Sequence, residues 1–473
     1  MAINRISNKK IYLEKLIDCQ KRIIESQQEN GCFQPEKFRQ EFPNSRWQEA
    51  VVTLAWAQKK LGKNYLKAIE KGLNYWLSVQ NSNGSFPEGN RSESFAATAF
   101  SSIAVTETLE LIGNKINTKL KERIIGALKK STKYLTANDN KGKTNLECAA
   151  ALALKKMQKF FEVPEKEIEK KIAVVLKNKT ESGFFKEDNG VDFAYSSLTC
   201  EMLFLLDKKE ECKKFVENQK YLIFPDGSFH ASFSRLNSWL TPSFLEFFGL
   251  TDCFPVMFHL PDLRHVMTDS YRLCLAIDYA KQSKKQIIKE PNDWVKFFPE
   301  KILIVRKPDY KAVFYLSEKF LYSIWFKEGL IVNTVDNRLN NTLIEDKFTA
   351  QEFDDFKFYF NKEQGTLEIQ GKCKTHLKEK NFLQKVIAKI SRPKIKKTFK
   401  FNKNSIEVKV RLSDNKTALE QLPVIGKVKV SPKFDSFKAD SKKLLVQSIF
   451  YGRKDFWIMR KEFKESLEYI LGG

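Results

Sequence analysis

The stretches QQENGCF, residues 27–33, and QNSNGSF, residues 80–86, decide the fold of this chain. The same Gly-x-Phe turn returns at Gly183 in ESGFF and at Gly227 in PDGSF, and a degenerate copy surrounds Gly142. Successive complete turns are 53, 99 and 44 residues apart, so the middle interval holds two units. A recurring turn of this kind indicates an architecture that repeats one supersecondary unit.

The segments on the two sides of each turn differ in character. Before the turn, charged and apolar residues alternate at helical spacing, which predicts an amphipathic helix with one wet face. After the turn comes a far more apolar helix, such as ESFAATAFSSIAVTETL at residues 93–109. The predicted amphipathic helices cover residues 10–28, 65–80, 120–135, 165–177 and 208–219, and a sixth apolar candidate starts at Thr268.

Alternation of amphipathic helices with almost entirely apolar helices predicts an outer layer and an inner layer. We therefore expect residues 1–285 to form an (α/α) toroid of five or six helix pairs. Gly allows a positive φ in each turn, and Phe anchors the turn to the core. The turns then lie at the end of the barrel where the inner helices begin. Their free N–H groups and dipoles favour anions, and a cleft there is the expected site. The alternative is a helical array without a cleft.

Beyond a polar segment at residues 282–296, which we interpret as a linker, the period changes from helical to alternating. SIEVKVRL at residues 405–412 places four aliphatic side chains on one face, as in a half-buried antiparallel strand. Many short strands with polar turns predict an antiparallel β-sandwich over residues 286–473. The chain is therefore expected to be an α+β multidomain protein.

The chain carries a formal net charge of +24, with 82 Lys and Arg against 58 Asp and Glu. One interpretation is an acidic partner, such as an acidic polysaccharide, a nucleic acid or an anionic membrane. The other is codon bias, because only 15 of the basic residues are Arg and because Lys, Asn, Ile and Phe are all abundant. Proteins that read nucleic acid favour Arg, so nucleic acid is the disfavoured partner.

Eight cysteines are present, none in CxxC spacing, and several stand within apolar runs, such as Cys148 in ECAAALAL and Cys200 in SLTCEML. This usage is typical of buried thiols in a reducing compartment. The N-terminal sequence lacks the apolar core of a secretion signal, and no uncharged apolar stretch of about 18 residues predicts a membrane span. We therefore expect a cytoplasmic protein without a membrane span.

An (α/α) toroid followed by an antiparallel β-sandwich resembles the layout of heparinase II/III-like polysaccharide lyases and of related chondroitin and alginate lyases. Three segments resemble uncharacterised heparinase-like proteins found among bacterial surface-polysaccharide genes. They are ESGFFKEDNGVDFAYSSLTCEML from Glu181, PDGSFHASFSRLNSWLTPSFLEFF from Pro225, and FPEKILIVRKPDYKAVFYL and the residues after it from Phe298. The resemblance implies a protein that acts on an acidic polysaccharide or oligosaccharide by β-elimination.

The chain also departs from the families that it resembles. Heparinase-like lyases carry a His-rich and Gly-rich signature at the start of the sandwich, whereas His376 is the only histidine of the predicted β domain. The turns resemble the Q-x-x-x-G-x-W repeats of terpenoid cyclases and prenyltransferases. The Asp-rich run and the zinc site that those enzymes need have no counterpart in the predicted barrel, so these activities are disfavoured.

A uronate lyase must neutralise the substrate carboxylate, remove the C5 proton and protonate the leaving oxygen. Arg, Asn or His serves the first task, and Tyr or His serves the other two. The catalytic candidates are Tyr195, His230, Arg235 and Asn237. The substrate-binding candidates, at the turn–helix junctions of the repeats, are Arg46, Arg91, Asn145, Asp188, Asn189 and Asp192.

These candidates also have structural interpretations. Asp188, Asp192 and Asn237 can cap the helices that follow them. Tyr195 can be a core residue with its hydroxyl satisfied locally, and His230 can be a loop residue. The sequence leaves both interpretations open.

No metal and no cofactor are expected, because the sequence has no ligand cluster of suitable spacing and no P-loop or Rossmann glycine pattern. Three functions stay open. The first is a lyase, and the second is a non-catalytic relative that binds glycan or a partner protein in surface-polysaccharide biosynthesis. The third is a glycoside hydrolase, for which Glu88, Asp188, Asp192 and Asp226 offer carboxylates.

Overall fold

The chain forms two compact units, Met1–Glu217 with Leu240–Ile287 and Asn218–Trp239 with Ile288–Gly473. The predicted boundary between residues 285 and 286 lies outside the described residues and stays a prediction. The computed structural model describes residues 8–34, 42–140, 142–187, 190–222, 224, 240–250, 263–280, 291–317, 320–326, 329–333, 342–344, 348–375, 394–412, 417–426, 429–431, 435–439, 456–464 and 466–472.

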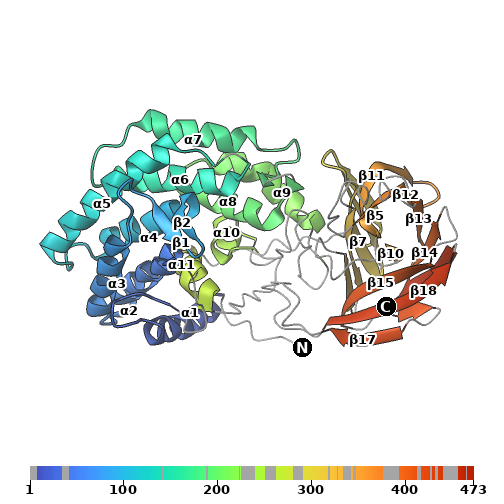
Figure 1. Cartoon of the computed structure of the whole chain (residues 1–473), viewed down its shortest axis with the longest axis horizontal. Helices are drawn as coiled ribbons and strands as arrows, with labels where there is room; N and C mark the ends of the chain where they lie inside the picture. The colour runs from blue at the N-terminus through green and yellow to red at the C-terminus, as the bar shows by residue number, and fades with distance from the viewer. Residues whose placement is uncertain are drawn as a thin grey trace, which may run out of the picture. The chain divides into compact units, whose positions relative to one another are not determined.

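The first unit is a ring of inner helices surrounded by outer helices (Figure 1). The outer layer contains α1 (Asn8–Glu25), α3 (Leu66–Ser78), α5 (Thr118–Ala137), α7 (Glu165–Lys177), η2 (Lys209–Cys212) and the first part of α9 (Lys213–Leu222). The inner layer contains η1 (Ser45–Glu49), α2 (Ala50–Leu61), α4 (Phe95–Ile112), α6 (Thr144–Met157), α8 (Phe193–Leu205), α10 (Pro242–Phe247) and α11 (Leu263–Tyr279). Each inner helix contacts the next, and α11 returns to α2, so the described residues close a ring of six.

The distribution of apolar residues explains which helices lie inside. The inner helix α4 buries 15 of its 18 residues, as its nearly continuous apolar sequence predicts. The outer helix α3 buries only Ile69, Gly72, Leu73 and Trp76, whose i, i+3, i+4, i+7 pattern forms one stripe. The predicted two-layer toroid is confirmed.

The Gly-x-Phe turns make the same contacts in successive repeats. Gly31, Gly84 and Gly183 have φ values of 94°, 87° and 85°, the left-handed conformation that glycine adopts without strain. The phenylalanine two positions later, as in Phe33 and Phe86, is fully buried. The turn at Gly227 lies outside the described residues.

A glutamine four residues before the glycine fastens each of the first two turns to the next outer helix. The Gln27 side chain donates to the carbonyl of Ala68 in α3 at 2.8 Å, and the Gln80 side chain donates to the carbonyl of Ala127 in α5 at 2.9 Å. The repeat in the sequence is therefore a repeat of side-chain contacts, which fixes each turn against its neighbour.

The inner helices run parallel to one another. Lys60 near the end of α2 pairs with Asp278 near the end of α11 at 3.4 Å, and late residues of α4 and α6, Glu107 and Lys156, also form an ion pair. Their N-termini therefore meet at one end of the ring, as expected from the position of the turns.

The second unit is built from antiparallel strands. The sheet order is β16-β19-β14-β13-β12-β11-β10-β15-β9-β8-β7-β6-β5, with β18 pairing to β15 and β17 pairing to β18. The strands are β5 (Trp294–Phe298), β6 (Ile302–Lys307), β7 (Tyr310–Tyr315), β8 (Leu321–Phe326), β9 (Gly329–Asn333), β10 (Thr342–Ile344), β11 (Phe348–Asn361), β12 (Thr366–Thr375), β13 (Lys394–Phe401), β14 (Ser405–Leu412), β15 (Thr417–Gly426), β16 (Lys429–Ser431), β17 (Asp435–Ala439), β18 (Phe456–Lys464) and β19 (Ser466–Gly472). The expected linker over residues 282–296 is wrong at its end, because Trp294 pairs with Arg306 in the β5–β6 register.

The sheet folds over so that its apolar faces pack as two layers. Phe314 of β7 and Tyr322 of β8 contact Phe399 of β13, with ring centroids 5.2 and 5.6 Å apart. In β14 every second residue from Ile406 to Val410 is buried, as the alternation predicts. The predicted sandwich is confirmed.

Candidate functional site

Two short hairpins and the first turns of the inner helices form the rim of the toroid, defined as residues 42–49, 86–95, 143–147, 186–187 and 190–195. Strands β1 (Phe86–Glu88) and β2 (Arg91–Ser94) precede α4, and β3 (Lys186–Glu187) and β4 (Gly190–Val191) precede α8. The Phe42 N–H donates to the carbonyl of Gly89 at 2.9 Å, so the first segment touches the first hairpin. The rim is the region in which sequence analysis expects the site.

The Arg46 side chain is fixed by two carboxylates and an aromatic ring. Asn44 caps η1 by accepting a hydrogen bond from the Arg46 N–H at 3.0 Å. The guanidinium pairs with Glu49, lies 3.9 Å from Glu88, and stacks over the Phe100 ring at 4.2 Å from its centroid. The predicted binding residue is thus also a structural residue, and its substrate-binding role stays a prediction.

The β1–β2 hairpin places Arg91 directly opposite Glu88, with the Arg91 side chain exposed to solvent. Ser94 caps α4 by accepting from the Ala97 N–H at 3.1 Å, and its hydroxyl donates to Glu88 at 2.5 Å. Glu88 therefore has partners on two sides, which disfavours it as one of the two carboxylates of a hydrolase.

Asn145 lies in the first turn of α6 and is buried. Its backbone N–H donates to the carboxylate of Glu187 at 2.6 Å, so a residue of β3 caps the inner helix α6. Within the described part of the chain, the buried side-chain oxygen of Asn145 has no hydrogen-bond partner. Such an oxygen can accept a hydrogen bond from a ligand or from a water molecule.

Asp192 is buried and caps α8, because its carboxylate accepts a hydrogen bond from the Tyr195 N–H at 2.9 Å. The structural interpretation of this residue is therefore correct, while its binding role is untested. Tyr195 stands in the first turn of α8 and is half-buried.

Asn145 and Tyr195 stand in the first turns of the neighbouring inner helices α6 and α8. One turn further along, the thiol of Cys148 in α6 contacts the carbonyl of Thr199 in α8 at 3.7 Å. The bridge between Lys143, just before α6, and Glu187, in the hairpin before α8, likewise places the starts of both helices at the rim. Five candidates, Asp188, Asn189, His230, Arg235 and Asn237, lie outside the described residues.

A buried ionic cluster, which sequence analysis did not identify, occupies the inside of the ring. Arg272 of α11 donates to Asp269 at 2.8 Å and lies 3.5 Å from Glu201 of α8. His265 bonds to the other oxygen of Asp269 at 2.9 Å, and Ser243 of α10 donates to Glu201. An ion pair thus joins α8 to α11, and a hydrogen bond joins α10 to α8.

A small cavity of about 30 Å³ lies beside this cluster, and Glu49, Glu201, Tyr271 and Arg272 are among its lining residues. Burial raises the pKa of Glu49 to about 7, although Arg46 lowers it. Burial also raises the pKa of Glu201, against the opposing charge of Arg272. The cavity is large enough for about one water molecule and too small for a sugar.

One signal in the sequence marks two members of this cluster. Glu201 interrupts the apolar run SSLTCEMLFLL, and Arg272 interrupts SYRLCLAI, so each charge falls on a helix that has no wet face. A charge at such a position is expected to find an opposite charge inside the protein. The sequence does not say which one.

Two further searches bear on the kind of site. Among the described residues, no group of three or more His, Cys, Asp or Glu side chains could hold a metal ion. In the same part of the chain, α4 is long and apolar enough to cross a membrane, but 83% of it is buried inside the protein, as in the core helix of a helical barrel.

Comparison with known proteins identifies the class to which this architecture belongs. Among solved structures, the chondroitin AC lyase of Streptomyces coelicolor A3, in complex with chondroitin sulphate, aligns with 100% of this chain and 81% of its own, with a TM-score of 0.61 and 9% identity. Heparinase III aligns with 99% of this chain and 85% of its own, with a TM-score of 0.57 and 11% identity. The shared feature is the fold, and by its fold this chain is a polysaccharide lyase-like protein.

A family model adds a second indication. Residues 9–192 match the family described as the ulvan lyase N-terminal domain. This range contains the first three complete Gly-x-Phe turns and the Asn145 junction. Comparison with curated protein sequences gives no match. The predicted resemblance to polysaccharide lyases is confirmed.

Proposed function

We propose that this protein cleaves an acidic polysaccharide by β-elimination at the rim of the toroid. The observation that carries the proposal is the placement of Asn145 and Tyr195 in the first turns of two adjacent, parallel inner helices. The polysaccharide lyase-like fold and the match to the ulvan lyase N-terminal domain support a lyase-type protein.

The rim is suited to stabilising negative charge. Helix N-termini carry partial positive charge, and those of α6 and α8 lie side by side. The proton on C5 of a uronate becomes acidic only when the adjacent carboxylate is neutralised. In the proposal, the side-chain NH2 group of Asn145 donates to that carboxylate, and its unpartnered oxygen accepts a hydrogen bond from a sugar hydroxyl.

Tyr195 then performs the proton transfers. Its phenolate removes the C5 proton, the electron pair forms the double bond between C4 and C5, and the bond from C4 to the leaving oxygen breaks. The phenol returns the proton to that oxygen, so a single group serves as base and acid. His230, Arg235 and Asn237, outside the described residues, complete the predicted catalytic set.

The reaction type is tested by digestion of uronate polysaccharides in water labelled with heavy oxygen, followed by mass spectrometry. Elimination adds no water, so fragments carry an unsaturated end and no label. Labelled fragments without unsaturated ends would establish a hydrolase and refute the proposal. Binding without cleavage over the whole panel would instead establish the non-catalytic glycan-binding relative.

A matched pair of variants tests the role of Asn145. Asn145→Ala is expected to lower kcat by about 100- to 1,000-fold, the usual effect of removing one group that stabilises developing charge. Asn74→Ala, an exposed position on the outer helix α3, is the control and should leave kcat unchanged. Equal rates for the two variants would contradict the assignment of Asn145.

A further inference from the structure

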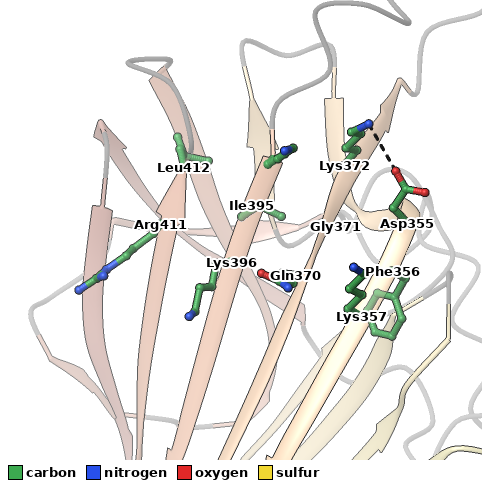
Figure 2. Close-up of a pocket in the computed structure, with 11 residues that line it drawn as sticks. Asp355, Phe356, Lys357, Gln370, Gly371, Lys372, Ile395, Lys396, Arg411 and Leu412 are labelled. Atoms are coloured by element: carbon green, nitrogen blue, oxygen red, sulfur yellow. Dashed lines mark ion pairs between the residues drawn. The ribbon is translucent and has the colours of Figure 1, made fainter.

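A groove on the exposed face of the sandwich gathers basic side chains from four adjacent strands (Figure 2). Its volume is about 520 Å³, within the range of sites for small ligands. The groove belongs entirely to the second unit. Its cationic lining residues, which we call the basic groove, are Lys357, Lys372, Lys394, Lys396 and Arg411.

The strand register explains why these residues share one face. Lys357 lies opposite Gln370, Gln370 lies opposite Lys396, and Lys396 lies opposite Arg411, in one row across β11, β12, β13 and β14. The alternate residues of the same strands, such as Ile369, point into the core. With strands about 4.8 Å apart, this row spans about 14 Å.

The negative charge in and near the groove is small. Asp355, which is 69% exposed, pairs with Lys372 at 3.4 Å. Glu368, on the next row of the same face, pairs with Lys396 at 2.7 Å. Among the side chains that the structure describes, two carboxylates therefore face five cations, which leaves a net positive charge.

Two pairs of like charges lie directly opposite each other in the sheet. Lys372 faces Lys394, and Lys396 faces Arg411. Like charges in this position destabilise a sheet, so the arrangement is unfavourable for folding alone. A bound polyanion removes the repulsion, which gives these four residues a common role.

We propose that the basic groove binds a segment of an acidic polysaccharide, the class of polymer proposed as the substrate of the rim. The row of cations at the spacing of the strands fits a linear polymer with charges repeated along its length. Gln370 in the middle of the row offers an amide to hydroxyl groups, and the Tyr359 ring, 64% exposed and two residues beyond Lys357, offers a face to a sugar ring.

The choice of a glycan as the polyanion rests on the proposed function, whereas the anionic character of the ligand rests on the groove alone. Nucleic acid fits less well, because single-strand binders stack successive bases on several aromatic rings and the groove has one arginine. An anionic membrane fits less well, because the surface is hollowed rather than protruding.

Lysine acetylation footprinting of the full chain locates the contact. The protein is acetylated with and without a chondroitin sulphate oligosaccharide, and modification is read at each lysine by mass spectrometry. We expect several-fold slower modification of Lys357, Lys372, Lys394 and Lys396. Exposed lysines of the toroid, Lys63, Lys67 and Lys119, are internal controls and should react at unchanged rates. Unprotected groove lysines would overturn the proposal.

Charge variants measure the contribution to affinity. The triple variant Lys357→Gln, Lys396→Gln, Arg411→Gln should weaken oligosaccharide binding by at least about tenfold. This estimate assigns each lost ion pair about 0.5 kcal/mol, the usual contribution of an exposed pair. The control Lys63→Gln, Lys67→Gln, Lys119→Gln removes the same charge elsewhere and should change the affinity by less than about twofold. Equal losses in both variants would overturn the proposal.

The same titration distinguishes the groove from the catalytic proposal and from other polyanions. Groove-dependent binding without unsaturated products supports the groove and defeats the lyase. Cleavage by a protein whose affinity for the oligosaccharide is unchanged in the groove variant supports the lyase and overturns the groove. Tighter groove-dependent binding of single-stranded poly-dT or of phosphatidylserine vesicles than of the oligosaccharide would overturn the assignment to a glycan.

Discussion

The substitution Gly84→Ala tests whether the repeated turns hold the toroid together. Gly84 has a φ of +87°, and a Cβ added there would lie 2.3 Å from the carbonyl oxygen of Lys130 in α5. Real Cβ contacts essentially never fall below 3.0 Å, so the turn and α5 must separate. The Ser131 hydroxyl donates to the Gly84 carbonyl at 3.1 Å, and separation strains this bond as well.

The magnitude follows from three contributions. The left-handed conformation costs alanine about 1–2 kcal/mol, and overpacking against a fixed backbone costs about 1–3 kcal/mol. The lower entropy of the unfolded alanine chain returns about 0.4–1 kcal/mol. We therefore expect Gly84→Ala to lower the free energy of unfolding of the toroid by about 3 kcal/mol.

Two other glycines separate these contributions. Gly62 ends α2 with a φ of +65° and has nothing within 4 Å of the added Cβ, so Gly62→Ala should cost only about 1 kcal/mol. Gly126 lies inside α5, with equally open space, and Gly126→Ala should stabilise the helix by about 0.5–1 kcal/mol.

The assay is urea unfolding followed by the helical circular dichroism signal, with all three variants measured beside the wild type. The expected order of stability is Gly126→Ala, wild type, Gly62→Ala and Gly84→Ala. A Gly84→Ala variant as stable as Gly62→Ala would refute the reasoning, because the close approach to α5 would then have no energetic effect.

Further predictions concern the buried ionic cluster. Burial raises the pKa of Glu49 from 4.5 to about 7, so the folded state holds this proton more tightly than the unfolded state. Stability from Glu49 is therefore present below pH 4.5 and lost by about pH 7, a change of about 3 kcal/mol that Glu49→Gln should remove from the pH profile of unfolding. An unchanged profile would contradict this assignment. Arg272→Met leaves the buried Glu201 without its cation and removes one partner of the partly exposed Asp269, and it should cost about 3–5 kcal/mol, whereas the exposed Arg123→Met should change stability by less than about 0.5 kcal/mol. Similar midpoints in thermal unfolding would argue against the cluster.

Much of the fold was predictable because periodicity reports which face of an element is buried. Helix α7 has the predicted bounds, Glu165–Lys177, and β14 has the predicted bounds, Ser405–Leu412. Strand β5 was missed because its five residues, WVKFF, follow a charged segment and are too few to show a period.

Contacts between residues that are far apart in the sequence could not be predicted from periodicity. Ring closure brings α11 beside α2 and α10, and this places Arg272 next to Glu201 across 71 residues of sequence. Likewise, Lys357 and Arg411 share a row only because of the register of four strands. Periodicity shows that a residue is buried or exposed, but tertiary structure selects its neighbour.

At the rim, the sequence correctly located the turn–helix junctions, but it did not determine the role of each side chain there. Asp192 and Asn145 stand where the repeat predicts, at the first turns of inner helices. The hydrogen bonds show that Asp192 caps its own helix, which is one of the two interpretations that the sequence left open, while Glu187, not a predicted candidate, caps the helix of Asn145. A capping role depends on backbone geometry around the residue, which composition does not reveal.

The most direct test of the account is the ultraviolet absorbance of unsaturated uronate during incubation with acidic polysaccharides. It compares the wild type with Tyr195→Phe and with Tyr65→Phe, a matched half-buried tyrosine at the start of the outer helix α3. The account predicts rising absorbance for the wild type and for Tyr65→Phe, and none for Tyr195→Phe. An equal rise in Tyr195→Phe, or no rise in the wild type with any acidic polysaccharide, would contradict it.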